Sequence, residues 1–119
     1  MAQFRFESLE IWQKAIEISD RLFDIGDVLR DQGRFRFSEQ IDSAAMSITN
    51  NISEGSGSYS DRDFANFLKF SHRSIFECAN ILVILQRRKL VSVEEKEELF
   101  NKLEHLSKME TNFRKTLLK

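Results

Sequence analysis

Polar side chains recur at helical spacing between residues 62 and 87, opposite a set of apolar ones. Successive intervals of 4, 3, 4, 7 and 7 residues keep them on one line of a helix. Cations on such a line can pair with phosphate groups, and amides or arginines can contact exposed bases. We call this line the basic ladder; its members are Arg62, Asn66, Lys69, Arg73, Asn80 and Arg87.

The basic ladder also has a simpler interpretation. Glu77 and Ile84 interrupt the line, so it is not a continuous groove for anions. Charged residues along a helix are often only the face that water solvates. The sequence leaves both interpretations open, a phosphate-binding face or an ordinary solvated face.

Two more basic groups lie near the ends of expected helices. Residues 87–89 are consecutive cations at the end of a helix, where positive charge also interacts favourably with the helix dipole. Residues 4–6 and 35–37 both read Phe-Arg-Phe, and aromatic rings beside arginine can stack single-stranded bases. The alternative is that these phenylalanines pack on the helix ends. Outside the ladder, the candidate nucleic-acid contacts are Arg34, Arg36, Arg88 and Lys89.

The sequence offers little for catalysis or metal binding. A di-metal site in a helical bundle needs Glu-x-x-His pairs on facing helices, and His72 and His105 have no such partner. Glu54 and Glu77 therefore do not suggest a metal site. Cys78 falls on an apolar face, which is typical of a small buried side chain. Because phosphate loops and serine triads are also missing, we expect no enzyme, metal or cofactor.

Composition predicts one all-α domain over residues 1–119. The chain has no proline and four glycines, and 31% of its residues are charged, with a net charge of −1. Its length suits a single core. One cysteine cannot form an internal disulfide, the first residues do not resemble a signal peptide, and no aliphatic run could span a bilayer. We therefore expect a cytoplasmic protein with no membrane partner and no small-molecule substrate.

Apolar spacing and capping residues divide the chain into four helices. Short connections make neighbouring helices antiparallel, which predicts an up-down-up-down four-helix bundle. The expected helices cover residues 9–31, 39–55, 61–88 and 93–117. Their expected N-caps are Ser8, Ser38, Ser60 and Ser92.

The second of these helices has an apolar face rich in small residues, beside a polar edge. Small residues let a neighbouring helix approach closely, and a buried polar edge must find partners. Such an edge can fix the register of an assembly, or Asn51 and Glu54 could bind a ligand. The apolar face is Ile41, Ala44, Ala45, Ile48, Ile52 and Gly55, and the polar edge is Gln40, Ser47, Asn51 and Glu54.

Residues 40–55 resemble the signature of the 23S rRNA intervening-sequence proteins, Q-I-x-x-A-A-x-S-I-x-N-N-I-S-E-G. The resemblance extends to Trp12, to Phe67-Leu68 and to Ser74-x-x-Glu77, and it covers most of the chain. It implies a left-handed bundle that assembles as a homopentameric ring, with no enzymatic activity. A related branch of this family serves as the nucleic-acid-binding accessory protein of diversity-generating retroelements.

The first and third helices are apolar over a wide arc, whereas the last has one stripe that Glu110 interrupts. A helix in a small monomeric bundle buries one face, so a second stripe suggests a covering subunit. The alternative is a core that wraps further round each helix. The candidate interface residues are Ile11, Ile18, Leu22, Ile25, Leu29, Phe67, Phe70, Ile81 and Leu85.

These observations lead to one functional hypothesis and one alternative. The hypothesis is a non-catalytic oligomer that binds RNA or DNA through the basic ladder and the loop arginines. The ladder and the family resemblance favour it. The alternative is a structural or protein-interaction oligomer without nucleic-acid affinity, which the net charge of −1 favours.

Overall fold

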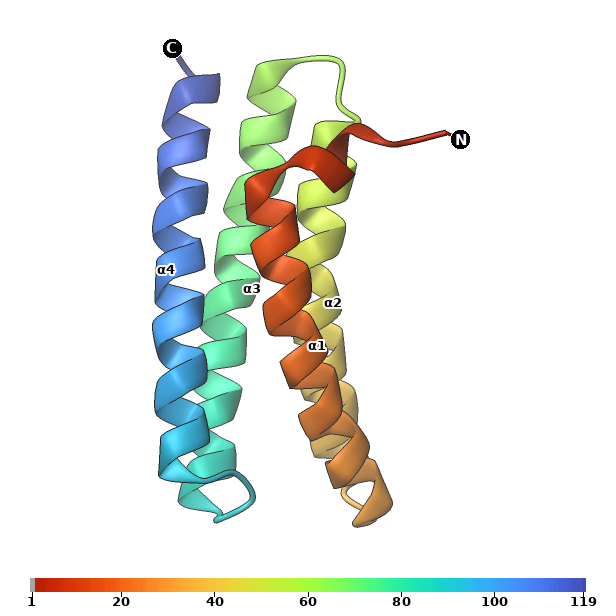
Figure 1. The fold of residues 1–119 in the computed structure, drawn as a ribbon, viewed down its shortest axis with the longest axis vertical. Coiled ribbons are helices and arrows are strands. Elements are labelled where there is room, and N and C mark those ends of the chain that lie inside the picture. The colour runs from red at the N-terminus through yellow and green to blue at the C-terminus, as the bar shows by residue number, and fades with distance from the viewer. Residues whose placement is uncertain (1) are drawn as a thin grey trace.

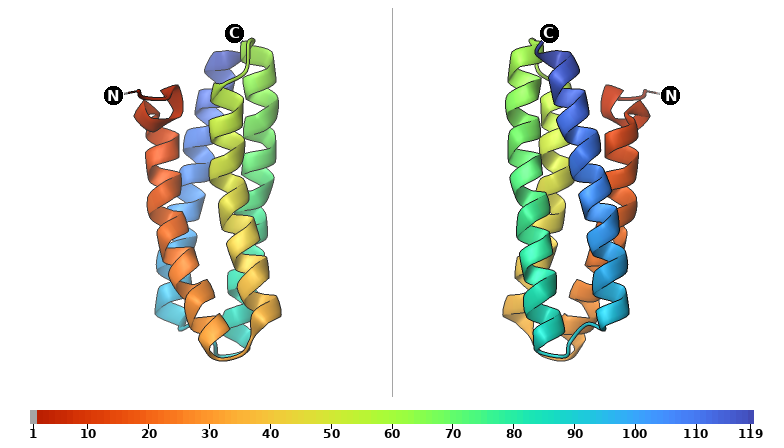
Figure 2. Two further views of the ribbon diagram at one scale, coloured as in Figure 1. Left: turned by 90° about the vertical axis from the view of Figure 1, so that its right-hand side faces the viewer. Right: turned by 90° about the vertical axis from the view of Figure 1, so that its left-hand side faces the viewer.

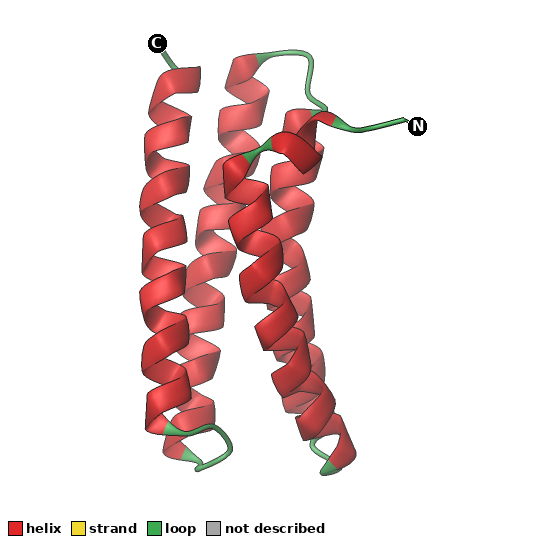
Figure 3. Cartoon of the chain, viewed as in Figure 1, coloured by secondary structure: helices red, strands yellow, loops and turns green. Residues whose placement is uncertain are grey.

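The computed structural model describes residues 2–119 and forms a bundle of long helices (Figures 1 and 3). Within these residues there is no strand, which confirms the all-α prediction. The elements are a 3-10 turn η1 (Arg5–Ser8) followed by α1 (Glu10–Asp31), α2 (Phe35–Ser56), α3 (Asp61–Arg87) and α4 (Val93–Leu117).

Successive helices run in opposite directions, as expected from their short connections. The α1–α2 and α3–α4 connections lie at one end of the bundle (Figures 1 and 2). The α2–α3 connection and both chain termini lie at the other end. The basic residues in the two connections at the first end are therefore distant from the start of α3.

The core is one continuous apolar cluster to which all four long helices contribute. Its largest side chains include Leu22, Ile48, Phe64, Leu82 and Leu103, each at most 1% exposed. Removal of such apolar surface from water is the main driving force for folding. The predicted antiparallel four-helix bundle therefore has a core within a single chain.

The closest approach between α2 and α3 depends on Gly55, as the small face of the second helix predicted. A Cβ atom placed on Gly55 would lie 2.7 Å from Cδ1 of Phe64 and 2.8 Å from Cβ of Phe67. Both distances are too short for a real contact, so any larger residue would push the helices apart. Ala44 and Ala45 are also buried on this helix, at 1% and 0% exposure.

Two of the predicted N-caps are confirmed. The hydroxyl oxygen of Ser60 accepts a hydrogen bond from the Asp63 amide at 3.1 Å. The hydroxyl oxygen of Ser92 accepts one from the Glu95 amide at 3.0 Å. These bonds satisfy amides that have no partner inside the helix, and they fix where α3 and α4 begin.

The other two predicted N-caps are wrong. Ser8 belongs to η1, and Leu9 occupies the N-cap position of α1. Ser38 lies inside α2, where it is buried and its hydroxyl donates to the Gly26 carbonyl at 2.8 Å. The second helix thus begins at Phe35, earlier than expected, and Ser38 joins α1 to α2 instead of capping a terminus.

The early start of α2 follows from a tight turn after α1. Gly33 has a φ of 76°, the left-handed conformation that glycine adopts at no steric cost. Its amide donates to the Arg30 carbonyl at 2.9 Å, and the Arg34 amide donates to the Leu29 carbonyl at 2.8 Å. Because this turn closes within three residues, Arg34 becomes the N-cap of α2.

The bundle itself buries most of the residues that were expected at a subunit interface. They are 0% to 7% exposed inside one chain, so their assignment to an outer surface is wrong. Each helix packs on two neighbours, which widens the arc that a single bundle can bury. Phe67 is half-buried and Phe70 is 44% exposed, so these two remain on the surface. The residues reassigned to the core are Ile11, Ile18, Leu22, Ile25, Leu29, Ile81 and Leu85.

Candidate nucleic-acid interface

All members of the basic ladder are exposed on the outer side of α3. From Arg62 to Arg87 the helix rises about 38 Å, so the ladder runs nearly the length of the bundle. In the part of the chain that the structure describes, none of the ladder cations lies within 4.0 Å of an acidic group. Their positive charge is therefore not neutralised by a direct ion pair.

The first half of the ladder is more suited to a ligand than the second. Arg73 places its guanidinium carbon 5.7 Å from the ring centroid of Phe70, and both side chains are exposed. An exposed aromatic ring beside arginine is a surface on which a base can stack. Further along α3, Glu77 and Ile84 are exposed and separate Arg73 from Arg87, as the sequence suggested.

The other candidate cations gather at the opposite end of the bundle. Arg34 and Arg36 lie at the start of α2, and Arg88 and Lys89 follow the end of α3; all four are exposed. Figure 1 shows that these two connections share one end, away from the start of α3. The ladder reaches this end at Arg87, whereas its first half, from Arg62 to Arg73, lies toward the other end of the bundle. Lys89 also has a structural role, because its φ of 63° forms the turn out of α3.

The first Phe-Arg-Phe segment packs on its own chain. The Arg5 guanidinium carbon lies 5.2 Å from the ring centroid of Phe64. Phe6 lies edge-on to Trp12, with ring centroids 5.0 Å apart. These contacts favour the packing interpretation for residues 4–6. Trp12, a residue of the family-like motif, is thus half-buried under η1.

The polar edge of α2 faces α3 at the surface of the bundle. The hydroxyl oxygens of Ser47 and Ser74 are 2.8 Å apart, and the Asn51 side-chain amide donates to the Ser47 carbonyl at 2.8 Å. Gln40 and Glu54 are exposed at the two ends of this edge. The polar edge of α2 therefore lies on the same side of the bundle as Glu77 of α3, which is also exposed.

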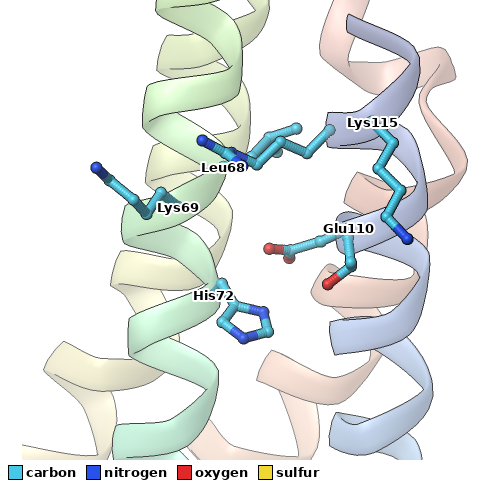
Figure 4. A pocket seen from close by; sticks show the side chains of 7 residues that line it. Leu68, Lys69, His72, Glu110 and Lys115 are labelled. Atoms are coloured by element: carbon cyan, nitrogen blue, oxygen red, sulfur yellow. The ribbon is translucent and has the colours of Figure 1, made fainter. Parts of the chain in front are cut away.

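A pocket of about 240 Å³ lies between α3 and α4, near the start of the ladder (Figure 4). It brings together basic residues of the two helices around a buried acid. Lys69 is the member of the ladder that lines it, whereas the residues from α4 were not predicted. The lining residues are Leu68, Lys69, His72, Glu110, Thr111, Arg114 and Lys115.

Glu110 is the buried acid of this pocket, at 1% exposure. The Ser71 hydroxyl is 2.9 Å from Oε2 of Glu110 and 3.0 Å from the Ile48 carbonyl oxygen. Oε1 has no hydrogen-bond partner in the structure. Burial raises the pKa of Glu110 to about 8, because water no longer stabilises the charged form, and the Ser71 hydrogen bond opposes this only partly.

Arg114 is held in place on the α4 side of the pocket. Its Nε donates to the Ala65 carbonyl oxygen at 3.1 Å, across to α3. Across the pocket, the His72 ring packs on Phe76, with centroids 5.0 Å apart. The interruption of the last apolar stripe by Glu110 was the sequence signal for this pocket, but its basic partners had no comparable signal.

The described residues give no geometry for metal or thiol chemistry. Within residues 2–119 no group of three His, Cys, Asp or Glu side chains could hold a metal ion. Cys78 is fully buried, and burial together with the nearby Glu77 charge raises the pKa of its thiol to about 12. A thiol that stays protonated is a poor nucleophile. In the same residues, no helix combines the length and apolar character needed to cross a bilayer.

The chain belongs to the family described as 23S rRNA-intervening sequence protein, whose family model matches residues 7–112. This agrees with the resemblance of residues 40–55 and of the residues around Trp12, Phe67 and Ser74.

A solved structure with the same fold is the crystal structure of a protein of unknown function from the S23 ribosomal protein family of Bacteroides thetaiotaomicron. It is 25% identical to this chain, with a TM-score of 0.82, and the match covers 88% of this chain and 98% of that one. No curated protein matches the chain. The comparisons thus give a family and a fold, and they do not give an activity.

Proposed function

We propose that the protein is a non-catalytic, self-associating bundle that binds RNA or DNA through the first half of the basic ladder. The observation that carries this proposal is the row of exposed cations Arg62, Lys69 and Arg73, none of which has an acidic neighbour within ion-pair distance among residues 2–119. Unpaired cations along one helix can follow a phosphate backbone, and binding releases the counterions of the nucleic acid. Phe70 beside Arg73 supplies a stacking surface for an unpaired base.

Self-association is proposed through the α2–α3 surface and not through the residues of the core. Gln40, Glu54 and Glu77 are exposed there beside the half-buried Asn51. A surface that binds a different surface of the next copy can close into a ring, and the family resemblance implies a ring of five. Repetition of a weak site around a ring raises the avidity for one long nucleic acid.

The alternative is a structural or protein-interaction oligomer without nucleic-acid affinity. The net charge of −1 favours it, because nucleic-acid-binding domains usually carry excess positive charge. The two functions differ in one measurable property. Nucleic-acid binding through cations weakens steeply as salt rises, whereas an apolar or neutral protein interface responds little to salt.

Fluorescence anisotropy with a labelled single-stranded RNA, measured over a salt series, tests the proposal. We expect micromolar binding at low salt and a linear fall of log K with log salt concentration. Changing Arg62, Lys69 and Arg73 together to Glu should weaken binding more than about tenfold. The matched control changes Lys14, Lys102 and Lys108 to Glu, since it alters net charge equally away from the ladder.

Equal losses in the two triple variants would show that only net charge matters, which contradicts a site on α3. No binding of RNA or DNA at low salt would leave the structural alternative. Sedimentation equilibrium provides the separate test of self-association. A single species of 14.0 kDa at micromolar concentration would contradict the ring.

A further inference from the structure

The pocket between α3 and α4 has basic side chains on both walls. Lys69 lies on α3, and Arg114 and Lys115 belong to α4. Figure 4 shows the amino groups of Lys69 and Lys115 directed away from the space between the two helices, so both side chains must turn inward to reach an anion there. Arg114 uses Nε to bond the Ala65 carbonyl, which leaves its terminal nitrogens available for another partner. In residues 2–119 no acidic group lies within 4.0 Å of these three cations.

Glu110 is the acidic residue that lines the pocket, and it does not cancel this positive charge. Its pKa of about 8 keeps most of the carboxyl groups protonated at neutral pH. The pocket is therefore positively charged although an acid lies at its base.

One carboxyl oxygen of Glu110, Oε1, is buried without a hydrogen-bond partner. Figure 4 shows the Glu110 side chain pointing from α4 toward α3. The Ser71 hydroxyl has one proton and lies within hydrogen-bond distance of both the Ile48 carbonyl and Oε2 of Glu110. When it donates to Ile48, the acid proton on Oε2 bonds to Ser71 and Oε1 is an acceptor without a donor. When it donates to Oε2, the acid proton resides on Oε1, and an anionic oxygen at this point would be stabilising because a buried donor without an acceptor is costly. Oε1 is shielded from solvent, so a rim side chain must move to admit that oxygen.

The pocket volume is adequate for such a group. About 240 Å³ corresponds to roughly eight water molecules at their volume in the liquid. That is room for a phosphate group and part of an attached sugar, with apolar Leu68 at the wall. Three cations around one pocket suit a phosphate better than a carboxylate, because a phosphate offers more acceptor oxygens in more directions.

We propose that the pocket between α3 and α4 is a phosphate-binding subsite, in which Lys69, Arg114 and Lys115 pair with the anion and Glu110 donates a hydrogen bond to it. The proposal rests on the proposed nucleic-acid binding for its physiological ligand, a phosphate of the RNA or DNA backbone. It extends the binding surface from the outer face of α3 onto α4. A free phosphate shares the same chemistry and could occupy the same pocket.

The test uses the full chain and variants of α4 that do not belong to the ladder. Arg114→Gln with Lys115→Gln removes the two α4 cations of the pocket. Lys102→Gln with Lys108→Gln is the matched control, because it removes two exposed α4 cations outside the pocket. Anisotropy with single-stranded RNA should show about a fivefold loss of affinity in the first pair and less than about a twofold loss in the second. Thermal unfolding of both variants identifies any loss of folding.

A second probe separates the two sources of phosphate. Inorganic phosphate is titrated into the isotope-labelled protein, and we expect amide shifts concentrated at residues 68–72 and 110–115. If the Arg114→Gln, Lys115→Gln variant binds RNA as tightly as the control variant does, the proposed subsite is wrong, whereas the proposed nucleic-acid binding stands. If neither RNA nor DNA binds but inorganic phosphate shifts the pocket amides, the subsite stands while the proposed function fails. If phosphate shifts no amide of the pocket and the pocket variant keeps its RNA affinity, the proposed subsite is overturned.

The role of Glu110 has its own readout in the pH dependence. The titratable and charged groups that line the pocket with Glu110 are Lys69 and His72 of α3 and Arg114 and Lys115 of α4, and from α2 the Ile48 carbonyl contacts Ser71, the hydrogen-bond partner of Glu110. Backbone phosphates of single-stranded DNA do not titrate between about pH 7 and about pH 9, so a loss of affinity in that interval reports ionisation of Glu110. Glu110→Gln should abolish that loss. A pH profile identical in the two proteins would exclude the proposed hydrogen bond.

Discussion

The two sides of α3 are built on different principles. Toward α2 the helices meet through Gly55, where a single added carbon would collide with Phe64 and Phe67, and the hydroxyls of Ser47 and Ser74 pair with each other. Toward α4 the packing opens into a pocket of about 240 Å³, and the buried Glu110 keeps one oxygen without a partner. The α2–α3 side is tightly packed and its hydroxyls are hydrogen-bonded, whereas the α3–α4 side has an open surface pocket and a buried acid.

This difference indicates where the molecule gives up stability. Proteins usually satisfy buried polar groups and fill cavities, so exceptions tend to lie at functional sites. The α2–α3 side holds the family motif and defines the bundle. The α3–α4 side carries the unusual electrostatics. Perturbation of the two sides should therefore have different consequences for folding and for ligand binding.

The largest expected effect is the pH dependence of folding stability that Glu110 causes. Because burial raises its pKa to about 8, the folded chain retains a proton that the unfolded chain releases near pH 4.5. Stability from this group is thus fully present below about pH 4.5 and falls as pH rises toward about 8, by at most about 1.4 kcal/mol per pH unit. Urea unfolding between those pH values should show the decline, and Glu110→Gln should remove its contribution. An unchanged pH slope in that variant would refute the raised pKa.

A somewhat smaller effect is expected on the opposite side of α3. Gly55→Ala should lower the free energy of unfolding by about 1–3 kcal/mol, because the added methyl group overpacks the α2–α3 contact. Gly57→Ala is the control, since its nearest atom to an added Cβ is 3.5 Å away. Denaturant unfolding compares the two. If Gly55→Ala were as stable as Gly57→Ala, the close approach of the helices would be incorrect.

Loss of the hydrogen bond between Ser47 and Ser74 should lower the free energy of unfolding moderately. Ser74→Ala leaves the Ser47 hydroxyl with the Asn51 amide as its remaining partner, which should cost about 1 kcal/mol. Nucleic-acid affinity should not change, because this pair lies on the side away from the pocket. Unfolding measurements and RNA anisotropy on the same variant check both statements. A weaker RNA complex would place binding on the α2–α3 surface instead.

The smallest effect on folding is expected at Lys115. Its side chain is exposed, and Lys115→Gln should change the free energy of unfolding by less than about 0.5 kcal/mol. The same change should still weaken RNA binding measurably. Thermal unfolding and anisotropy together separate these outcomes. A variant that is unstable and binds poorly would assign Lys115 a role in folding.

Much of the fold could be predicted from the sequence because its signals are local. The serines before α3 and α4 each have an acidic residue three positions later, and both cap as expected. The small face of α2 also predicted a close neighbour, which Gly55 confirms. The predicted start of α2 was wrong, because Ser38 bonds to the Gly26 carbonyl of α1, and no local sequence pattern reveals such a tertiary partner.

The candidate site was less predictable for the same reason. Ladder periodicity alone predicted exposure of Arg62, Lys69 and Arg73, and it did so correctly. The wide apolar arc of α1 was misjudged, because a sequence does not tell how far two neighbouring helices wrap round a third. The α3–α4 pocket depends on the rotation of α4 against α3. Only that rotation brings Arg114 of α4 to the same pocket as Lys69 of α3.

The antiparallel arrangement has a practical consequence for work on this protein. Both chain ends emerge at the end of the bundle where α4 finishes, a few residues after Lys115 (Figure 1). An affinity tag, fluorophore or fused partner attached to the C-terminus would therefore crowd the pocket between α3 and α4. The two connections that contain Gly33 and Lys89 lie at the far end of the bundle, so a label in either connection stays away from that pocket.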